Sequence, residues 1–369
     1  MRELVVRDNM DLPKRLSQQL AGQEGETRQK AARLVVDLAE IAKADGFVEV
    51  DNAHVSGVSV ITGGHGLRRF LSDLSGDKGG RVAITTTLNS AGCDKEKMKE
   101  MDIEWPDFLE QQFEIIEAYD SLGIESTLSC TPYDRGIELD SGIASWAESN
   151  AVCFSNSWTS LITNRESGLS ALATGLTGFA PKWGLHLTEN RMPNIFVTLD
   201  CEMNNLSDWS IFGDWIGKQV RPDWDLSWGP MPLICGMPEY LSFAAKKALT
   251  AAAANYGCPM LWAEGHSADP PLDKDANGNW LPPKDEQEKI AEEVQELLSP
   301  SRLNMLSPKE QALALIRKTP TRPVDITLPK RRLKFAEEEN PPPGLAPAQK
   351  KHLDSRGNHV FYNYSCHPT

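Results

Sequence analysis

Residues 31–50 read AARLVVDLAEIAKADGFVEV, a stretch in which one spacing of apolar residues gives way to another. Its first part repeats apolar residues at positions 31, 34, 35, 38, 41 and 42, which is helical spacing. Gly46 then breaks the pattern, and the following Phe47-Val48-Glu49-Val50 is typical of a short strand. The stretch therefore predicts a helix followed by a strand, the repeating unit of an α/β fold.

The same alternation continues along the chain. Further strands are predicted at 82–84, 124–128, 195–199 and 260–262, with helices around 108–116 and 244–254. Because strands that alternate with helices form largely parallel sheets, we expect two α/β lobes, residues 1–165 and 166–270. Residues 271–369 are rich in proline and charge, and there we expect a tail with two helices, 284–298 and 307–318.

Composition narrows the class of protein. The chain has 369 residues, 40% of them hydrophobic, so it can bury a sizeable core, and its formal net charge of -14 argues against a nucleic-acid partner. Its N-terminus has no apolar segment of a secretory signal, and no apolar run approaches membrane-spanning length. The seven cysteines are scattered, which indicates reduced thiols. A cytoplasmic protein is the expectation, with no membrane partner.

Polar residues follow three of the predicted strands directly. Residues 51–57 follow the first, 85–89 the second and 129–133 the third, and they bring hydroxyls, amides, an imidazole and a thiol. Ligands of open α/β sheets bind at this carboxyl edge. The three segments together predict a site, although a single histidine such as His54 is more often structural and the threonines also suit a strand.

The densest polar stretch is WAESNAV at 146–152, followed by TNRE at 163–166. Carboxylate, hydroxyl, amide and guanidinium groups stand here beside small apolar residues. Buried polar groups destabilise a fold unless they are paired. The stretch therefore predicts a network around a ligand, and the alternative is a structural hydrogen-bond network.

Six segments, in order and spacing, carry a resemblance to a known family. They are LAGQEG at 20–25, AHVSG at 53–57, TTLN at 86–89, SCTPY at 129–133, WAESNAV at 146–152 and TNRE at 163–166. Over roughly residues 13–270 the chain resembles the catalytic large subunit of aconitase X. The resemblance implies aconitase-like lobes with mostly parallel sheets, and a C-terminal part that is shortened or loosely ordered.

The resemblance also implies an activity, that of a hydro-lyase (dehydratase) acting at an iron centre, either an iron-sulfur cluster or a mononuclear iron. The expected substrate is a small hydroxy acid, most readily cis-3-hydroxy-L-proline, which would yield Δ1-pyrroline-2-carboxylate; the alternative is 5-phosphomevalonate. Elimination of water needs a base, donors for the developing negative charge and a Lewis acid.

The matching positions give candidate residues for each of these roles. Catalytic roles fall to Glu148, Ser149, Asn150 and His54. Substrate contacts fall to Ser56, Thr86, Thr87, Asn89, Asn164, Arg165 and Lys247, and metal ligation to Cys130 and Cys366.

Departures from the family pattern leave another reading open. Ala263 stands where the family has a histidine, and the nearby His266 is a candidate to replace it from a shifted position. Only two of the family's three cysteine ligands have counterparts. The swivelling small domain has no counterpart either, so the resemblance implies a separate small subunit as partner. The remaining alternative is a degenerate or truncated paralogue that binds ligand or partner without turnover.

Overall fold

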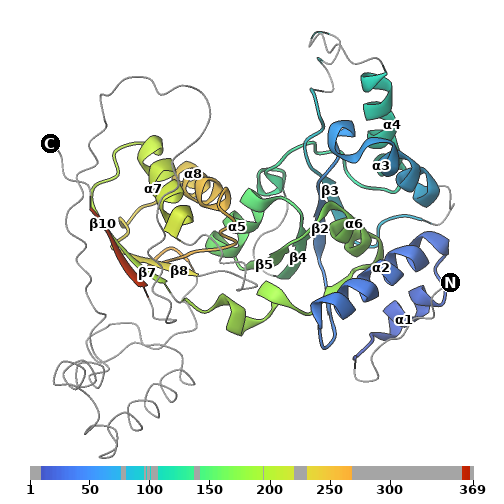
Figure 1. Ribbon diagram of the computed structural model, residues 1–369, viewed down its shortest axis with the longest axis horizontal. Helices are drawn as coiled ribbons and strands as arrows, with labels where there is room; N and C mark the ends of the chain where they lie inside the picture. The colour runs from blue at the N-terminus through green and yellow to red at the C-terminus, as the bar shows by residue number, and fades with distance from the viewer. Residues whose placement is uncertain are drawn as a thin grey trace, which may run out of the picture.

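The computed structural model describes residues 10–75, 80–94, 97, 100, 107–136, 142–193, 195–219, 231–267 and 360–365. Its larger sheets are two four-stranded parallel sheets, which lie side by side (Figure 1). We name residues 10–193 the first lobe, and residues 195–267 with 360–365 the second lobe. Helices and strands alternate in both, which confirms the predicted α/β class.

The first sheet has the strand order β3-β2-β4-β5 and all of its pairs are parallel. Its strands are β3 (Thr85–Leu88), β2 (Asn52–Val55), β4 (Gly142–Trp146) and β5 (Leu161–Arg165). From β2 the chain passes outward to β3, then crosses back to β4 on the other side of β2. The winding direction therefore reverses between β2 and β4, and open α/β sheets bind ligands at such a reversal.

Two segments predicted as strand-end loops are themselves the strands of this sheet. Residues 52–55 form β2 and residues 85–88 form β3, whereas residues 47–49 form β1 (Phe47–Glu49), antiparallel to β6 (Phe179–Pro181). The prediction of a strand at 82–84 was wrong, because the strand begins at Thr85, where β-branched threonines favour it. The strand predicted at 124–128 is reduced to one bridge, between Glu125 and Thr87.

One helix lies at the centre of the first lobe. Nearly every residue of α6 (Gly168–Thr177) is buried, and it packs against α2 (Glu26–Ala42) and β2 (Figure 1). A Cβ on Gly175 would lie 2.8 Å from Thr86 Oγ1, so only glycine lets the helix approach the sheet so closely. Ser167 caps its N-terminus by accepting from the Ser170 backbone N–H at 3.0 Å.

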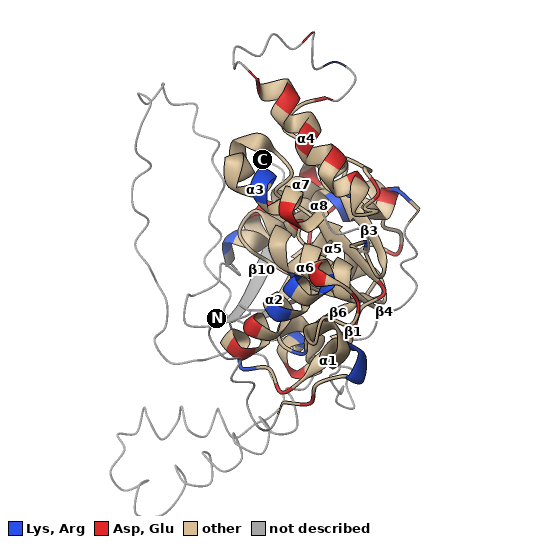
Figure 2. Cartoon of the chain, turned by 90° about the vertical axis from the view of Figure 1, so that its right-hand side faces the viewer, with Lys and Arg blue, Asp and Glu red and all other residues tan. Residues whose placement is uncertain are grey.

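The remaining helices of the described part are α1 (Lys14–Leu20), α3 (Val60–Ser75), α4 (Phe108–Ser121), α5 (Ser149–Trp158), α7 (Leu206–Gln219) and α8 (Phe243–Ala254). Helix α1 packs on α2, α3 on α4, and α7 on α8. Acidic residues recur along the exposed side of α4, in keeping with the negative charge of the chain (Figure 2). None of the helices in the described part is both long and apolar enough to cross a membrane.

The second sheet has the order β10-β7-β8-β9, again parallel throughout. Its strands are β10 (Val360–Ser365), β7 (Ile195–Asp200), β8 (Pro232–Cys235) and β9 (Trp262–Ala263). A strand from the predicted tail thus completes this sheet, which the sequence did not predict. The helices predicted at 284–298 and 307–318 lie outside the described residues.

The two lobes share a helix interface. Helix α5 of the first lobe packs against α8 of the second, and Cys153 of α5 belongs to the core formed around α7 and α8. Helix α6 packs on β2, so the segment after residue 165 lies with the first sheet. The division at residues 165 and 166 remains a prediction.

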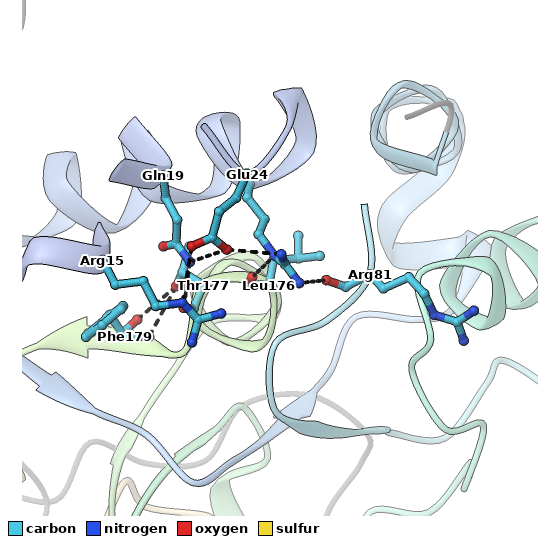
Figure 3. Close-up of polar contacts among 8 residues, drawn as sticks. Arg15, Gln19, Glu24, Arg81, Leu176, Thr177 and Phe179 are labelled. Atoms are coloured by element: carbon cyan, nitrogen blue, oxygen red, sulfur yellow. Dashed lines mark hydrogen bonds and ion pairs between the residues drawn. The ribbon is translucent and has the colours of Figure 1, made fainter. Parts of the chain in front are cut away.

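The carbonyl groups at the end of α6 are satisfied by side chains from the first two helices (Figure 3). Gln19 Nε2 donates to Thr177 O at 3.1 Å, and Arg28 Nε donates to Leu176 O at 3.2 Å. Glu24 holds both donors, because its carboxylate accepts from Gln19 at 3.3 Å and from Arg28 at 3.0 Å. This contact satisfies acceptors that a helix end otherwise leaves without partners.

Charge makes this contact dependent on pH. Burial raises the pKa of Glu24. The hydrogen bonds from Arg15 and Gln19 and the charges of Arg15 and Arg28 lower it by more than burial raises it, so the net shift is downward. A carboxyl group with a lowered folded-state pKa stabilises the fold above its unfolded value of 4.5, and this stabilisation is lost as the pH falls through the folded-state pKa.

The substitution Glu24→Gln should therefore lower the free energy of unfolding at pH 7 by about 1 kcal/mol or less. The difference from the unsubstituted chain should shrink as the pH falls below 4.5 and through the lowered folded-state pKa of Glu24, because the carboxyl group then becomes protonated. Urea denaturation at pH 7 and across this acid range measures the difference. Glu26→Gln, which removes an exposed ion pair with Lys30, is the matched control and should change stability less. A difference that persisted unchanged at acid pH would contradict the ionic account.

Candidate functional site

Polar side chains gather at the carboxyl edge of the first sheet, on both sides of the reversal between β2 and β4. Ser56 follows β2, Asn89 follows β3, and Glu148 follows β4 at the N-cap position of α5, where its side chain makes no cap hydrogen bond. Ser149 and Asn150 form the first turn of α5. The structure therefore brings five of the predicted site residues to one edge.

Glu148 is held in one orientation by two amides. Asn89 Nδ2 donates to Glu148 Oε2 at 2.7 Å, and Asn150 Nδ2 donates to Glu148 Oε1 at 2.9 Å. Asn89 is itself fixed, because its Oδ1 accepts from the Ser90 backbone N–H at 2.7 Å. Both carboxylate oxygens thus have a neutral donor, and the half-buried carboxylate stands at the positive end of α5.

His54 lies inside β2 and is completely buried. Its Nδ1 contacts Thr87 Oγ1 at 2.8 Å, and its Nε2 has no hydrogen-bond partner, although the Ser129 backbone lies close enough to affect the ring. Burial lowers the pKa of His54 to about 4, and the Ser129 backbone raises it only in part. The imidazole is therefore neutral at neutral pH, and it links β2, β3 and the segment before Cys130.

Thr86 and Thr87, which were predicted to contact substrate, are also buried within β3. Thr86 Oγ1 donates to the Ile84 carbonyl at 3.0 Å and lies against Gly175 of α6. Of the predicted substrate residues on β2 and β3, only Ser56 and Asn89 lie beyond the strand ends. The threonines build the sheet that supports this edge.

Cys130 is exposed, on a short loop with an anchor at each end. At the first end, the Ser129 backbone N–H donates to the Leu88 carbonyl at 3.3 Å. At the other end, Tyr133 stacks on Phe154 of α5 with ring centroids 3.9 Å apart. Burial raises the pKa of the Tyr133 hydroxyl, and the neighbouring Asp134, Cys130 and Glu148 raise it further. Cys130 and Glu148 therefore both lie within electrostatic reach of Tyr133.

Lys247 of α8 lies against this loop, in the second lobe. Its Nζ donates to Asp134 Oδ2 at 2.6 Å and stands 5.5 Å from the centroid of the Tyr133 ring and 5.8 Å from that of Phe243. The cation predicted to hold a substrate carboxylate thus already has a carboxylate partner. The pair joins the loop of Cys130 to the second lobe.

Asn164 and Arg165 point to different surroundings. Asn164 is buried at the open edge of β5, where its Oδ1 accepts from the Leu185 N–H at 2.7 Å and its Nδ2 donates to the Trp183 carbonyl at 3.1 Å. Arg165 is exposed at the end of β5. The structure places Arg165 near the carboxyl edge and gives Asn164 a role in joining β5 to the next segment.

A second carboxyl group at this edge was quoted in the sequence motif but not counted among the site residues. Glu166 follows β5, its Oε2 accepts from Ser170 Oγ at 2.7 Å, and its buried Oε1 has no hydrogen-bond partner. Burial raises the pKa of Glu166, although the Ser170 hydroxyl lowers it in part. Glu166 lies one residue after the end of β5, and Glu148 lies two residues after the end of β4. This position after a strand was the sequence signal by which Glu166 could have been predicted as a site residue.

The residues of the described part do not by themselves fit an iron site. Within that part no group of three or more His, Cys, Asp or Glu side chains is placed to hold a metal ion, and Cys130 supplies a single thiol at the edge. The other predicted ligand, Cys366, lies outside the described residues, as does any contact it makes. No catalytic step through iron is derived from these residues.

The fold and the carboxyl edge together define a doubly wound α/β protein with a carboxylate, amides and a thiol at its winding reversal. Comparison with known proteins gives the family. A family model, the aconitase X first domain, matches residues 9–189. The crystal structure of aconitase X from Thermococcus kodakaraensis (holo-form) aligns with a TM-score of 0.61 and 34% identity, over 71% of this chain and 63% of that one. Residues 9–189, about half of the chain, belong to the aconitase X family.

Two curated relatives show the range of named activities. The phosphomevalonate dehydratase large subunit of Thermococcus kodakarensis is 37% identical over 205 residues, which are 55% of this chain and 50% of that protein. The cis-3-hydroxy-L-proline dehydratase of Pseudomonas aeruginosa is 34% identical over 184 residues, 49% of this chain and 31% of that protein. This chain spans about half, or less, of the length of these relatives.

The close approach of α6 to β2 can be tested at Gly168. A Cβ on this residue would lie 2.2 Å from the Ser56 carbonyl oxygen, so one of the two backbones must move. Gly168→Ala should therefore destabilise the fold by about 1–3 kcal/mol. Gly66→Ala is the control, because a Cβ on Gly66 of α3 meets nothing within 4 Å, and alanine favours a helix. Equal unfolding midpoints for the two variants would contradict the contact.

The ion pair between the lobes can be tested by a double-mutant cycle. Asp134→Asn and Lys247→Met should each lower stability, with a coupling of about 0.5–1 kcal/mol, because the two side chains are only 32% and 34% exposed. The control cycle uses Arg33→Met and Asp37→Asn, a more exposed pair, and should give a smaller coupling. Additive effects of the two substitutions at 134 and 247 would show that the pair does not join the lobes.

Proposed function

We propose that this chain is the large part of a hydro-lyase that removes water from a small hydroxy acid. The observation that supports the proposal most strongly is the Glu148 carboxylate, held by Asn89 and Asn150 at the winding reversal of the sheet. The relatives named as dehydratases support the same reaction class. Family membership rests on the comparison; the assignment of activity to this chain is our proposal.

Elimination of water moves a proton from carbon and releases a hydroxyl from its neighbour. Glu148 is the group that we propose handles a proton, because its two oxygens are positioned before substrate arrives and a fixed base is more effective than a mobile one. Asn89 and Asn150 are proposed to set its orientation, and Ser149, at the start of α5, to donate to a substrate oxygen. His54 and Thr87 support the sheet beneath them.

Iron would supply a Lewis acid for the departing hydroxyl when bound. We propose Cys130 as a ligand, because its thiol is exposed at the same edge as Glu148. Its loop is fixed by the Tyr133 stack and by the pair of Asp134 and Lys247, which keeps the sulfur in place. The remaining ligands are proposed to come from Cys366 or from a partner chain.

The substrate that we propose first is cis-3-hydroxy-L-proline. Two of the cations in or near the motif segments already have carboxylate partners, Arg68 with Glu114 and Lys247 with Asp134, so few cations remain for a substrate anion, among them the exposed Arg165. A phosphate group would require more cations than a carboxylate does. The second candidate is 5-phosphomevalonate, which the 37% identity to relatives of that name favours.

A partner chain belongs to this proposal. Relatives of this chain carry the name "large subunit", and we propose a small subunit that closes the carboxyl edge and brings groups that the described residues lack. Candidate small subunits are therefore co-expressed with the full chain and purified without oxygen, and iron and sulfide are quantified. Loss of water from each of the two substrates is then followed by the appearance of its product.

Under these conditions Glu148→Gln should lower kcat by about 10²- to 10⁴-fold, because glutamine has a similar size but cannot take a proton, and it can accept only one of the two hydrogen bonds from Asn89 and Asn150. Glu117→Gln, an exposed carboxylate on α4, is the control and should leave kcat unchanged. If only one of the two substrates is turned over, that compound is the substrate. Absence of turnover and of iron with every partner would instead support the non-catalytic paralogue.

A further inference from the structure

A second polar cluster lies at the junction of the two lobes, around Arg191. This residue ends the short 3-10 helix η4 (Thr188–Arg191), in the segment that leads from the first sheet to β7. Its guanidinium group is mostly buried, donates from Nη1 to Asn156 Oδ1 at 3.0 Å, and stands 5.7 Å from the centroid of the Trp262 ring. The indole Nε1 of Trp262 donates in turn to the Arg191 carbonyl at 2.7 Å.

Arg191 has no carboxylate partner in the part of the chain that the structure describes. The ion pairs there involve other arginines, for example Arg28 with Glu24 and Arg33 with Asp37. A buried cation without a counter-ion loses its hydration and gains no ion pair, which destabilises a fold. Burial lowers the pKa of Arg191 to about 10, in line with this unfavourable surrounding.

The neighbouring groups do not neutralise the charge. His186, on the preceding turn, is buried, and its pKa is lowered by burial and also by the charge of Arg191. It is therefore neutral near pH 7 and supplies no negative charge. Asn156 offers a single amide oxygen, which also accepts from the Thr163 backbone N–H at 3.1 Å. The Trp262 face attracts a cation only weakly compared with a carboxylate.

The geometry leaves part of the guanidinium group open to a ligand. A guanidinium group has five N–H donors in a planar fork, and among the described residues only Nη1 has a side-chain acceptor. Arg191 as a whole is only half-buried, so part of its side chain reaches the surface. The Trp262 ring and Asn156 orient the fork from two sides.

We propose that Arg191 is the anchor of an oxyanion site at the junction of the lobes, for a carboxylate or phosphate group. The planar fork matches two oxygens of either group. The site draws on α5 through Asn156, on β9 through Trp262 and on the segment between the lobes. A bound anion there would brace these three segments against one another. This proposal is independent of the activity proposed above.

The test uses the full chain, inorganic phosphate and acetate as separate probes at constant ionic strength, and the thermal unfolding midpoint as readout. The midpoint should rise with one of the two anions and level off, because a ligand that binds only the folded state stabilises it. A response to phosphate alone identifies a phosphate group as the ligand, and a response to acetate alone a carboxylate.

Arg191→Met separates this site from a structural arginine. In buffer without either probe its midpoint should equal or exceed that of the unsubstituted chain, because the uncompensated charge is gone. Its response to both probes should vanish. Arg69→Met, at an exposed position on α3, should keep the full response. A lower midpoint for Arg191→Met together with no anion response in the unsubstituted chain would overturn the proposal.

Arg191→Lys covers the case in which the methionine variant fails to fold. Lysine keeps the charge but loses the fork, so calorimetric titration should show binding weakened by about ten- to a hundredfold, the loss of one charge-assisted hydrogen bond. Unchanged binding in the lysine variant would place the anion elsewhere and refute the site.

Discussion

The parallel pairing of β2 with both β3 and β4 is the constraint on which the first lobe depends. All four residues of β2 are buried, and the strand has a partner on each side. Because β3 and β4 flank β2 on opposite sides and all three strands are parallel, their carboxyl ends meet at one edge. Ser56, Asn89 and Glu148 therefore reach that edge although they lie far apart in sequence. The amide contact between Asn89 and Glu148 is a direct result of that pairing.

Close helix packing maintains the same constraint from one side. Helix α6 lies against β2 and β3 through glycine and small residues, and Gly168 and Gly175 mark the points where backbone or a threonine leaves no room for a side chain. The Ala-Thr-Gly sequence of this helix therefore reflects geometry rather than helix propensity. From the opposite direction, the Tyr133 and Phe154 stack fixes the Cys130 loop to α5.

The sequence predicted the α/β class and several elements, because long apolar periodicities and glycine breaks are local signals. Helices α2, α4 and α8 and strand β7 lie where periodicity placed them. Strands β2 and β3 were mistaken for loops, because His54 and the threonines are polar and only the tertiary fold shows that they are buried. The resemblance of short segments gave the edge residues. The partners of Lys247 and the isolation of Arg191 depend on contacts between distant segments, which no local pattern reveals.

The way α6 ends has a consequence for how the chain can be shortened. Gln19 and Arg28 come from the first two helices, yet the carbonyls they satisfy belong to the central helix, almost 160 residues further along. A version of the protein that started after α2 would keep every strand of the first sheet and still leave two main-chain acceptors of its innermost helix without donors. The amino-terminal helices are therefore an integral part of the folding unit, and trimming them should give insoluble material rather than a smaller soluble domain.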